Sequence, residues 1–297
     1  LFLSHYFPPE VNAPASRTFE HSRVWAQTGH EAFVVTNVPN HPAGRIYPGY
    51  RNALAQSETV ADIKVYRLLT FLAANRGIVR RSFSYFFYMV MSVLAAPFLP
   101  RVDVVVSTSP QFFCGLAGFF VSRIKRVPWV LEIRDLWPES IMAVGAVSRS
   151  LTLRWLVWLA NFAYRKADLI LCVTDSFKTA IMAEGIPGEK IAVIKNGVDL
   201  EFFSPERSLG PEAGRIPGLE NTQGKFVLSY VGTHGMAHGL DTVLKAAELL
   251  RDEPNVLFLL VGDGAEREHL LKQRDIMRLD NVVFLDQQPK TRMPAIW

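Results

Sequence analysis

The chain has 297 residues, of which 49% are hydrophobic and 20% charged, and its formal net charge is +4. This length fits about two domains, and the composition favours a large buried core over a disordered chain. The Lys and Arg residues form no single stripe, which argues against a nucleic-acid-binding protein and leaves an anionic membrane surface or a phosphorylated substrate as partners.

The two cysteines, Cys114 and Cys172, each lie in an apolar stretch. We expect buried free thiols, as in a reducing compartment, and no zinc site, because no zinc-ligand spacing is present. The chain begins LFLSHYFPPE, without a methionine or a signal-peptide charge pattern. This start resembles the second half of a strand, so we expect a fragment at both ends.

Short β-rich runs alternate with longer helical runs over the first part of the chain. Such alternation is typical of βαβ units and predicts an α/β domain with a doubly wound parallel sheet over 1–204. The predicted strands are 1–4, 32–37, 63–68, 102–108, 129–133, 169–174 and 191–196, and the predicted helices are about 13–28, 80–99, 111–125, 150–166 and 176–184.

A change of composition follows. Residues 205–224 are rich in Pro, Gly and charge, which predicts a linker or surface loop. A second series then has strands at 226–232, 256–262 and 281–286 and helices at about 239–251 and 264–277. A parallel sheet buries both faces and needs more strands than this, so we expect the second domain, 225–297, to be incomplete. Two such domains predict a ligand held in a cleft between them.

The run WVLEIRDLWPES, 129–140, begins as a buried strand and ends in a group of charged residues. Ligands of open parallel sheets bind beyond the carboxyl ends of the strands, where charged side chains can meet a substrate. Arg134 and Asp135 are therefore predicted to line the reacting centre, with Asp135 orienting or deprotonating an acceptor hydroxyl. Glu139 is predicted to contact the acceptor.

The loop after the first strand, SHYFPPEVNAPASR, contains no glycine. A dinucleotide-binding fingerprint would need Gly-x-Gly-x-x-Gly here, which argues against an NAD-dependent oxidoreductase. His5, Glu10, Asn12 and Arg17 are candidates to face the cleft and bind an acceptor. For each of them, a place in a solvated loop is the alternative.

The Ser and Thr residues at 107–109 precede a predicted helix, and N-capping explains them without a role in function. No two aspartates are separated by a single residue anywhere in the chain. The Asp-x-Asp pair that commonly holds a metal ion against a nucleotide diphosphate is therefore missing. We expect a site without a metal.

The sharpest motif is YVGTHGMAHGLDTVLKAAELL, in which a strand runs into a loop and then a helix. Gly232, Gly235 and Gly239 permit close backbone approach, and the helix N-terminus offers free N–H groups to an anion. His234 and His238 are candidate donors to a diphosphate, which would favour their charged form. An ordinary strand–helix turn with surface histidines is the alternative.

The run VGDGAEREHLL repeats this arrangement one unit later, with Gly262 and Gly264 flanking Asp263 at a strand end. A tight turn explains a lone Gly-x-Gly equally well. In a parallel sheet, however, this loop falls on the same rim as the preceding one.

The segment 83–99 is nearly all apolar and has Arg80, Arg81 and Arg101 at its ends. It is at the lower limit of the roughly 17–25 residues that span a bilayer. The flanking arginines and the aromatic residues favour a helix docked at a membrane interface, and two tryptophans in 151–168 add to this signal. Core helices of the first domain are the alternative.

Taken in order, HYFPPEVNAPASR, SPQFFCGLAG, EIRDLWPES, IAVIKNGVDLEFF, YVGTHGMAHGLD and NVVFLDQQPK resemble bacterial glycosyltransferases of family 4, which have the GT-B fold, over essentially the whole chain. The branch resembled most builds lipid-linked surface polysaccharides such as colanic acid and O-antigen. The resemblance implies two Rossmann-like domains facing a cleft, a nucleotide-sugar donor bound by the second and a lipid-linked saccharide acceptor bound by the first. It also implies retention of anomeric configuration, no metal, no cofactor besides the donor, and a peripheral position on the cytoplasmic face of the inner membrane.

The predicted donor-binding residues are Gly232, Thr233, His234, Gly235, His238, Gly239, Gly262, Asp263, Gly264 and Gln288. Many family members carry an Arg directly after the first glycine of the phosphate loop and a Lys directly before the last, where this chain has Thr233 and His238. The diphosphate would then depend more on backbone N–H groups and imidazolium. Many members also have a His where this chain reads Arg134-Asp135.

The family's pair of glutamates, seven residues apart, is expected to follow NVVFLDQQP, after the end of this chain. We therefore expect the chain by itself to be inactive. Two other functions stay open: a non-catalytic, membrane-docked scaffold that binds sugar nucleotides, and a sugar-nucleotide epimerase of the same fold. Two downstream glutamates would favour the transferase over the scaffold, and the apolar helix at 83–99 argues against the epimerase.

Overall fold

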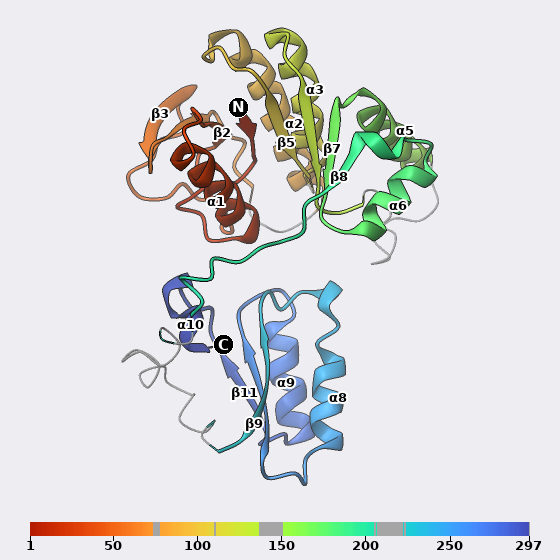
Figure 1. The fold of residues 1–297 in the computed structure, drawn as a ribbon. Coiled ribbons are helices and arrows are strands. Elements are labelled where there is room, and N and C mark those ends of the chain that lie inside the picture. The colour runs from red at the N-terminus through yellow and green to blue at the C-terminus, as the bar shows by residue number, and fades with distance from the viewer. Residues whose placement is uncertain are drawn as a thin grey trace. The chain divides into compact units, whose positions relative to one another are not determined.

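A computed structural model of the chain describes residues 1–73, 78–109, 111–136, 151–204 and 224–296, together with positions 206 and 222. The chain forms two compact units, Leu1–Asn196 and Gly197–Trp297 (Figure 1). Most of the predicted linker 205–224 lies outside the described residues, and so does Glu139.

The first unit is built on one sheet with the strand order β3-β4-β2-β1-β5-β6-β7-β8. Neighbouring strands are parallel except for β3 and β4. The order reverses between β1 and β5, and ligands of doubly wound sheets bind beyond the carboxyl ends at such a switch point. The strands are β1 (Phe2–Leu3), β2 (Phe33–Asn37), β3 (Ala55–Val60), β4 (Ile63–Leu68), β5 (Val105–Thr108), β6 (Trp129–Ile133), β7 (Leu169–Cys172) and β8 (Ile191–Val193).

The sequence did not predict β3, which pairs antiparallel with β4 at the edge of the sheet (Figure 1). Its residues, AQSETV, alternate between exposed and half-buried positions. An edge strand with no fully buried face needs no run of large apolar side chains, so the pattern that identified the other strands is absent here.

The helices of the first unit lie where the sequence predicts them. They are α1 (Ala13–Gln27), α2 (Ile78–Ala95), α3 (Phe112–Lys125), α5 (Leu151–Lys166) and α6 (Asp175–Ala183). The helix predicted at 80–99 ends at Ala95 and continues as a 3-10 turn, Ala96–Phe98. Pro97 explains this change, because it has no N–H to donate to an α-helical hydrogen bond. A further 3-10 turn, Gly188–Lys190, leads into β8.

The side of α2 that faces the sheet is buried, with Tyr88 and Ser92 fully enclosed, so the prediction of a core helix is confirmed for that side. Other apolar side chains of α2 are exposed, among them Val79, 82% exposed, and Phe83, 48% exposed. No helix in the described part of the chain is both long enough and apolar enough to span a bilayer.

The second unit contains the parallel sheet β11-β10-β9. Its elements are β9 (Phe226–Val231), a 3-10 turn η5 (Met236–His238), α8 (Asp241–Leu249), β10 (Val256–Val261), α9 (Arg267–Met277), β11 (Val282–Leu285), a 3-10 turn η6 (Lys290–Arg292) and α10 (Met293–Ile296). The central strand β10 has apolar contacts on both faces: Phe258 and Leu260 pack with α8 and α9, while Leu259 and Val261 pack with α10. This explains its continuous apolar run, VLFLLV.

Candidate functional site

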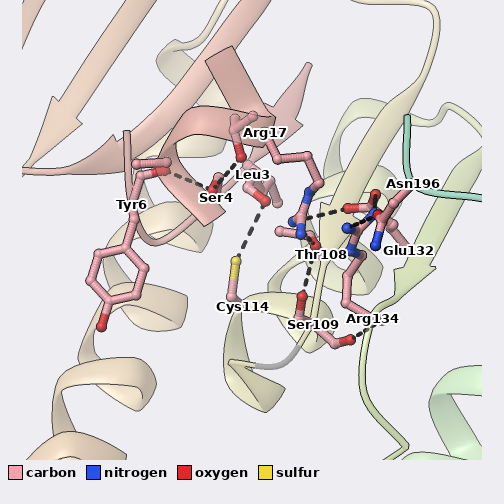
Figure 2. A network of polar contacts seen from close by, with 12 residues as sticks. Leu3, Ser4, Tyr6, Arg17, Thr108, Ser109, Cys114, Glu132, Arg134 and Asn196 are labelled. Carbon is pink, nitrogen blue, oxygen red and sulfur yellow. Dashed lines mark hydrogen bonds and ion pairs between the residues drawn. The ribbon is translucent and has the colours of Figure 1, made fainter. Parts of the chain in front are cut away.

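Charged side chains from α1 and from the end of β6 meet at the switch point of the first sheet (Figure 2). Glu132, in β6, is 6% exposed. One carboxylate oxygen lies 3.2 Å from the Arg17 guanidinium of α1, and the other lies 3.4 Å from the Arg134 guanidinium. Two cations therefore share one buried carboxylate, and we call these three residues the charged cluster.

Hydroxyl and amide groups hold the charged cluster in place. Arg17 donates to Thr108 Oγ1 at 2.7 Å, and the Arg134 backbone N–H donates to Ser109 Oγ at 2.8 Å. The Arg134 side chain also donates to Asn196 Oδ1. Thr108 ends β5, Ser109 follows it and Asn196 follows β8, so the cluster spans several strand ends. With two guanidinium groups to one carboxylate, it suits a substrate that carries negative charge.

The structure corrects the N-capping explanation for the hydroxyl groups at 107–109. The N-cap of α3 is Gln111, and no side chain caps this helix. Ser107 instead accepts a hydrogen bond from the Trp129 indole, while Thr108 and Ser109 support the charged cluster. Sequence reasoning also left Glu132 and Asn196 out of the site. A glutamate inside the buried run WVLEI was the available signal, because a buried charge needs a partner.

Asp135 follows the charged cluster and lines a pocket between β6, α3 and α5 that is open to solvent. The pocket walls are mostly apolar, with Leu116 and Ile133 among them, and Ser109 lies at the same pocket. Partial burial raises the pKa of the Asp135 carboxyl, and this outweighs the opposite effect of Arg134 and Arg17. A carboxylate with a raised pKa is a better proton acceptor, as a general base requires.

His5 is only 4% exposed, so a solvated loop is wrong for this residue. Its ring lies 3.1 Å from the Asn37 side-chain nitrogen. Burial lowers the pKa of His5 to about 3, so the imidazole is neutral. It is one of the residues lining a second pocket, with Tyr6 and Arg81.

Glu10 and Asn12 both bind backbone N–H groups of this chain. The Glu10 carboxylate is buried and accepts from the N–H groups of Asn40 and His41, both at 2.9 Å. Burial raises the pKa of Glu10 despite these bonds. Asn12 caps α1 by accepting from Ala15 N–H at 2.9 Å. A structural role is thus visible for both, and a contact with an acceptor stays a prediction.

In the second unit, the glycine loop Gly232–Gly239 joins β9 to α8. Leu240 is the N-cap of α8, and no side chain caps it. Gly239 adopts a left-handed conformation, with φ of 58°, which orients the chain as it enters the helix. The Thr242 and Val243 N–H groups already donate to Gly239 O and Leu240 O, both at 2.9 Å. The N–H groups of Leu240 and Asp241 are therefore the ones at this helix start that suit an anion.

The loop after β10 packs directly on the glycine loop. Gly232 N–H donates to Val261 O and His234 N–H donates to Asp263 O, both at 2.9 Å. A Cβ atom at Gly262 would overlap Gly232 O, and one at Gly264 would overlap the His234 backbone. The prediction that both loops lie on one rim is therefore confirmed. The glycines at 262 and 264 serve the contact between the two loops.

The two histidines of the glycine loop have different environments. The His234 ring is fully buried and contacts Phe284 edge-on at 5.9 Å. Within the part of the chain that the structure describes, its two nitrogens have no hydrogen-bond partner. Burial, and then Arg267, lowers the pKa of His234, which disfavours its charged form, and a donor role for this residue stays a prediction. His238 is exposed and lies over Gly235. It stays the candidate donor.

Thr233 is exposed and Gln288 is half-buried, and both lie on the same rim of the second sheet. Gln288 follows β11, donates to Asp286 O at 3.1 Å and accepts from Arg292 at 3.2 Å. Cys114 and Cys172 are buried free thiols, as predicted. Within the described ranges, no group of three His, Cys, Asp or Glu side chains could hold a metal ion.

Comparison with known families identifies the chain. Residues 15–202 match the family described as Glycosyltransferase Family 4, and residues 216–297 match the family described as Glycosyl transferases group 1. The chain belongs to Glycosyltransferase Family 4. It is a glycosyltransferase, which confirms the enzyme class predicted from the ordered motifs.

Curated relatives include the putative colanic acid biosynthesis glycosyl transferase WcaI of Escherichia coli (strain K12), 22% identical over 295 residues. That match covers 98% of this chain and 72% of the relative. The UDP-Gal:alpha-D-GlcNAc-diphosphoundecaprenol alpha-1,3-galactosyltransferase of Escherichia coli is 32% identical over 168 residues, covering 55% of this chain and 41% of the relative. The probable glycosyltransferase WbjE of Pseudomonas aeruginosa is 28% identical over 170 residues, covering 56% of this chain and 40% of the relative.

Solved structures confirm the predicted GT-B fold. Sucrose-phosphate synthase from Thermosynechococcus elongatus has a TM-score of 0.69 at 16% identity, with 99% of this chain and 69% of that chain covered. WaaG, a glycosyltransferase involved in lipopolysaccharide biosynthesis, has a TM-score of 0.65 at 14% identity, with 98% and 71% covered. Anabaena HepE in complex with UDP and glucose has a TM-score of 0.62 at 18% identity, with 99% and 71% covered.

Proposed function

We propose that the whole protein moves a sugar from a nucleotide diphosphate sugar to a lipid-linked glycan in bacterial surface polysaccharide synthesis, with retention of configuration and without a metal ion. The observation that carries the proposal is the glycine loop that ends on the uncapped N-terminus of α8. The names of the curated relatives support polysaccharide synthesis, and HepE is known in complex with UDP and with UDP-glucose.

The glycine loop supports catalysis through the departing diphosphate. Breaking the sugar–phosphate bond places negative charge on the leaving group while positive charge builds on the anomeric carbon. Backbone N–H groups fixed in advance at that leaving group stabilise the transition state more than the ground state. Buried His234 shapes the loop from behind, and exposed His238 adds one side-chain donor from the rim.

The first unit would supply the acceptor half of the reaction. Asp135 would orient or deprotonate the attacking hydroxyl, helped by the raised pKa of its carboxyl. The charged cluster beside it would hold anionic parts of the reactants, because its two guanidinium groups exceed the single carboxylate of Glu132.

A lipid-linked acceptor and a peripheral place on the cytoplasmic face of the inner membrane fit the surface of α2. Several apolar side chains there and on the 3-10 turn after it are exposed, with Phe98 the most at 89%, and Arg80, Arg81 and Arg101 lie near the two ends of this segment. Apolar side chains next to basic ones suit an anionic membrane surface. One curated relative is named for an acceptor that is a sugar diphosphate of undecaprenol.

The test is transfer of radiolabelled sugar by the complete protein to a glycolipid acceptor. We expect His238→Ala to lower kcat/KM by about 10- to 100-fold, the value of one hydrogen bond to a charged group. His30→Ala is the matched control, because His30 is exposed and precedes β2 at the opposite edge of its sheet. If the unaltered protein, His238→Ala and His30→Ala all transfer sugar at the same rate, His238 is not part of the site. No transfer from any nucleotide sugar would refute the proposed function.

A further inference from the structure

A second pocket, polar and open to solvent, lies at the same edge of the first sheet as the charged cluster. Its lining comes from the segments that follow β1 and β2 and from the first turns of α2, and we call it the α2 pocket. The side chains that matter are His5, Tyr6, Asn40, His41, Arg81 and Tyr85.

The guanidinium of Arg81 carries a positive charge in the lining of the α2 pocket. It donates to the Tyr85 hydroxyl at 3.1 Å, and within the described ranges no carboxylate lies at ion-pair distance from it. A guanidinium has five donors, so most of them are open to a ligand. The first turn of α2 contains no acidic residue, and its dipole adds positive potential.

Among the described residues, no carboxylate lines the α2 pocket. The one behind it, Glu10, is buried and engaged with the backbone N–H groups of Asn40 and His41. A pocket with a guanidinium, hydroxyl groups and imidazoles, and without a facing carboxylate, matches the oxygens of a phosphate group.

The aromatic walls make the α2 pocket rigid. The His5 ring meets both Tyr6 and Tyr85 edge-on, with centroids 4.7 Å apart in each pair, and the Tyr6 and His41 rings meet at 5.1 Å. Because these rings hold one another, their hydroxyl and imidazole groups are positioned before a ligand arrives, which lowers the cost of binding.

The α2 pocket and the charged cluster lie on two sides of the end of β1. His5 and Tyr6 follow that strand, and Figure 2 shows the Tyr6 side chain pointing away from Arg17 and Glu132. Beside the pocket, on the first turns of α2, Val79 and Phe83 expose apolar side chains. A ligand with a phosphate in the α2 pocket would thus have apolar surface on one side and the charged cluster on the other.

We propose that the α2 pocket binds the diphosphate of the lipid-linked acceptor, with Arg81 as the cation that recognises it. This rests on the proposed function, since it assigns to that reaction the acceptor's phosphate subsite. The sugar attached to the diphosphate then extends toward Asp135 and the charged cluster, and the lipid chain extends along the exposed apolar side chains of α2.

The first experiment measures binding of inorganic pyrophosphate to the complete protein by calorimetry, with saturating UDP present to occupy the donor site. We expect Arg81→Gln to weaken binding by about 10- to 100-fold. Arg80→Gln is the matched control, because it removes the same charge from the adjacent exposed position, which does not line the pocket. Arg81→Lys should restore part of the affinity. No binding to the unaltered protein, or equal losses in Arg81→Gln and Arg80→Gln, would overturn the proposal.

The second experiment distinguishes a lipid-linked diphosphate from a free one. Transfer is measured with a sugar on a short isoprenyl diphosphate and with the same sugar on a neutral alkyl chain. Arg81→Gln should raise KM for the diphosphate acceptor about 10- to 100-fold and leave KM for the neutral acceptor unchanged. If Arg81→Gln weakens the binding of inorganic pyrophosphate but changes neither KM, the pocket binds a free anion and is not the acceptor subsite. If UDP itself does not bind, the proposed function fails. If UDP binds and Arg81→Gln matches the control, only the α2 pocket assignment fails.

Discussion

The two domains present their candidate sites through different chemical groups. In the first domain, charged side chains from α1 and from the residues after β6 meet over a switch point and are held by one buried carboxylate. In the second, two loops lie backbone to backbone, and the candidate anion donors are the N–H groups of Leu240 and Asp241 at the start of α8, because those of Thr242 and Val243 already donate to Gly239 O and Leu240 O. In the proposed reaction, side chains give the first site its acid–base chemistry, whereas backbone donors, with His238 at the rim, give the second site its anion binding.

This difference predicts which changes each site tolerates. The first site should be sensitive to the loss of a charge and to pH, because its geometry depends on ion pairs and its chemistry on a carboxylate. The second should be sensitive to the addition of a single Cβ atom, because its geometry depends on the close approach of two loops.

Asp135→Asn tests the largest effect. In the complete protein we expect a fall in kcat of about 10²- to 10⁴-fold, because an amide cannot accept the acceptor's proton. Asp175→Asn, a mostly exposed aspartate paired with Lys195, is the control and should leave kcat unchanged. Since partial burial raises the pKa of the Asp135 carboxyl, this group protonates at a higher pH than a fully solvated aspartate. When kcat is measured against pH, its fall at low pH should therefore occur at a pH above the usual pKa of aspartate. A fall at the usual aspartate pKa would contradict the assignment of Asp135.

Glu132→Gln tests the charged cluster. It leaves Arg17 and Arg134 without their shared carboxylate, and loss of one partner of a buried pair costs about 3–5 kcal/mol. The measurement is urea unfolding of the first domain's signal. Glu184→Gln, an exposed carboxylate that accepts from Asn161, should change stability little by comparison. Equal stability of the two variants would show that the cluster does not hold this edge of the sheet together.

Gly262→Ala tests the contact between the loops. At this position φ is +146°, and the added Cβ would overlap Gly232 O, so we expect a loss of about 2–4 kcal/mol together with weaker UDP binding. Gly197→Ala, where a Cβ would meet no atom within 4 Å, is the control. If Gly262→Ala unfolds at the same denaturant concentration as the control, the two loops do not pack as described.

His234→Phe tests the smallest effect, and it should be a gain. The ring nitrogens are buried without partners, so an apolar ring of similar shape should stabilise the domain by about 1–2 kcal/mol. The folded protein keeps His234 neutral because its pKa is lowered, whereas the unfolded chain takes up a proton below about pH 6.5. Stability therefore falls as the pH drops below that value, and His234→Phe should reduce this fall. If His234→Phe instead lowers both stability and UDP affinity, His234 is part of the donor-binding site.

The comparison also shows what the sequence could predict. Strands such as VLFLLV were predictable because burial on both faces requires a continuous apolar run, whereas β3 at the edge has no such requirement. The donors to Thr108 and Ser109 lie 91 and 25 positions away, so the charged cluster appears only once β1, β5 and β6 are adjacent.

The two histidines of the glycine loop also show what the sequence alone could not predict. His234 and His238 have similar surroundings in the sequence, and both were predicted as donors to the diphosphate. Only the packing of the β10–α9 loop buries His234 and leaves His238 exposed. The sequence could therefore locate the loop and its glycines, but it could not tell which imidazole faces outward.

The central claim is that backbone N–H groups at the start of α8 receive the donor diphosphate. An NMR titration of the isotope-labelled chain with UDP tests it most directly. We expect the largest amide shifts at Gly235 and at residues 239–241, with little change at Arg17 and Glu132. Shifts confined to the first domain, or a titration that leaves the amides of 239–241 unmoved, would contradict the account.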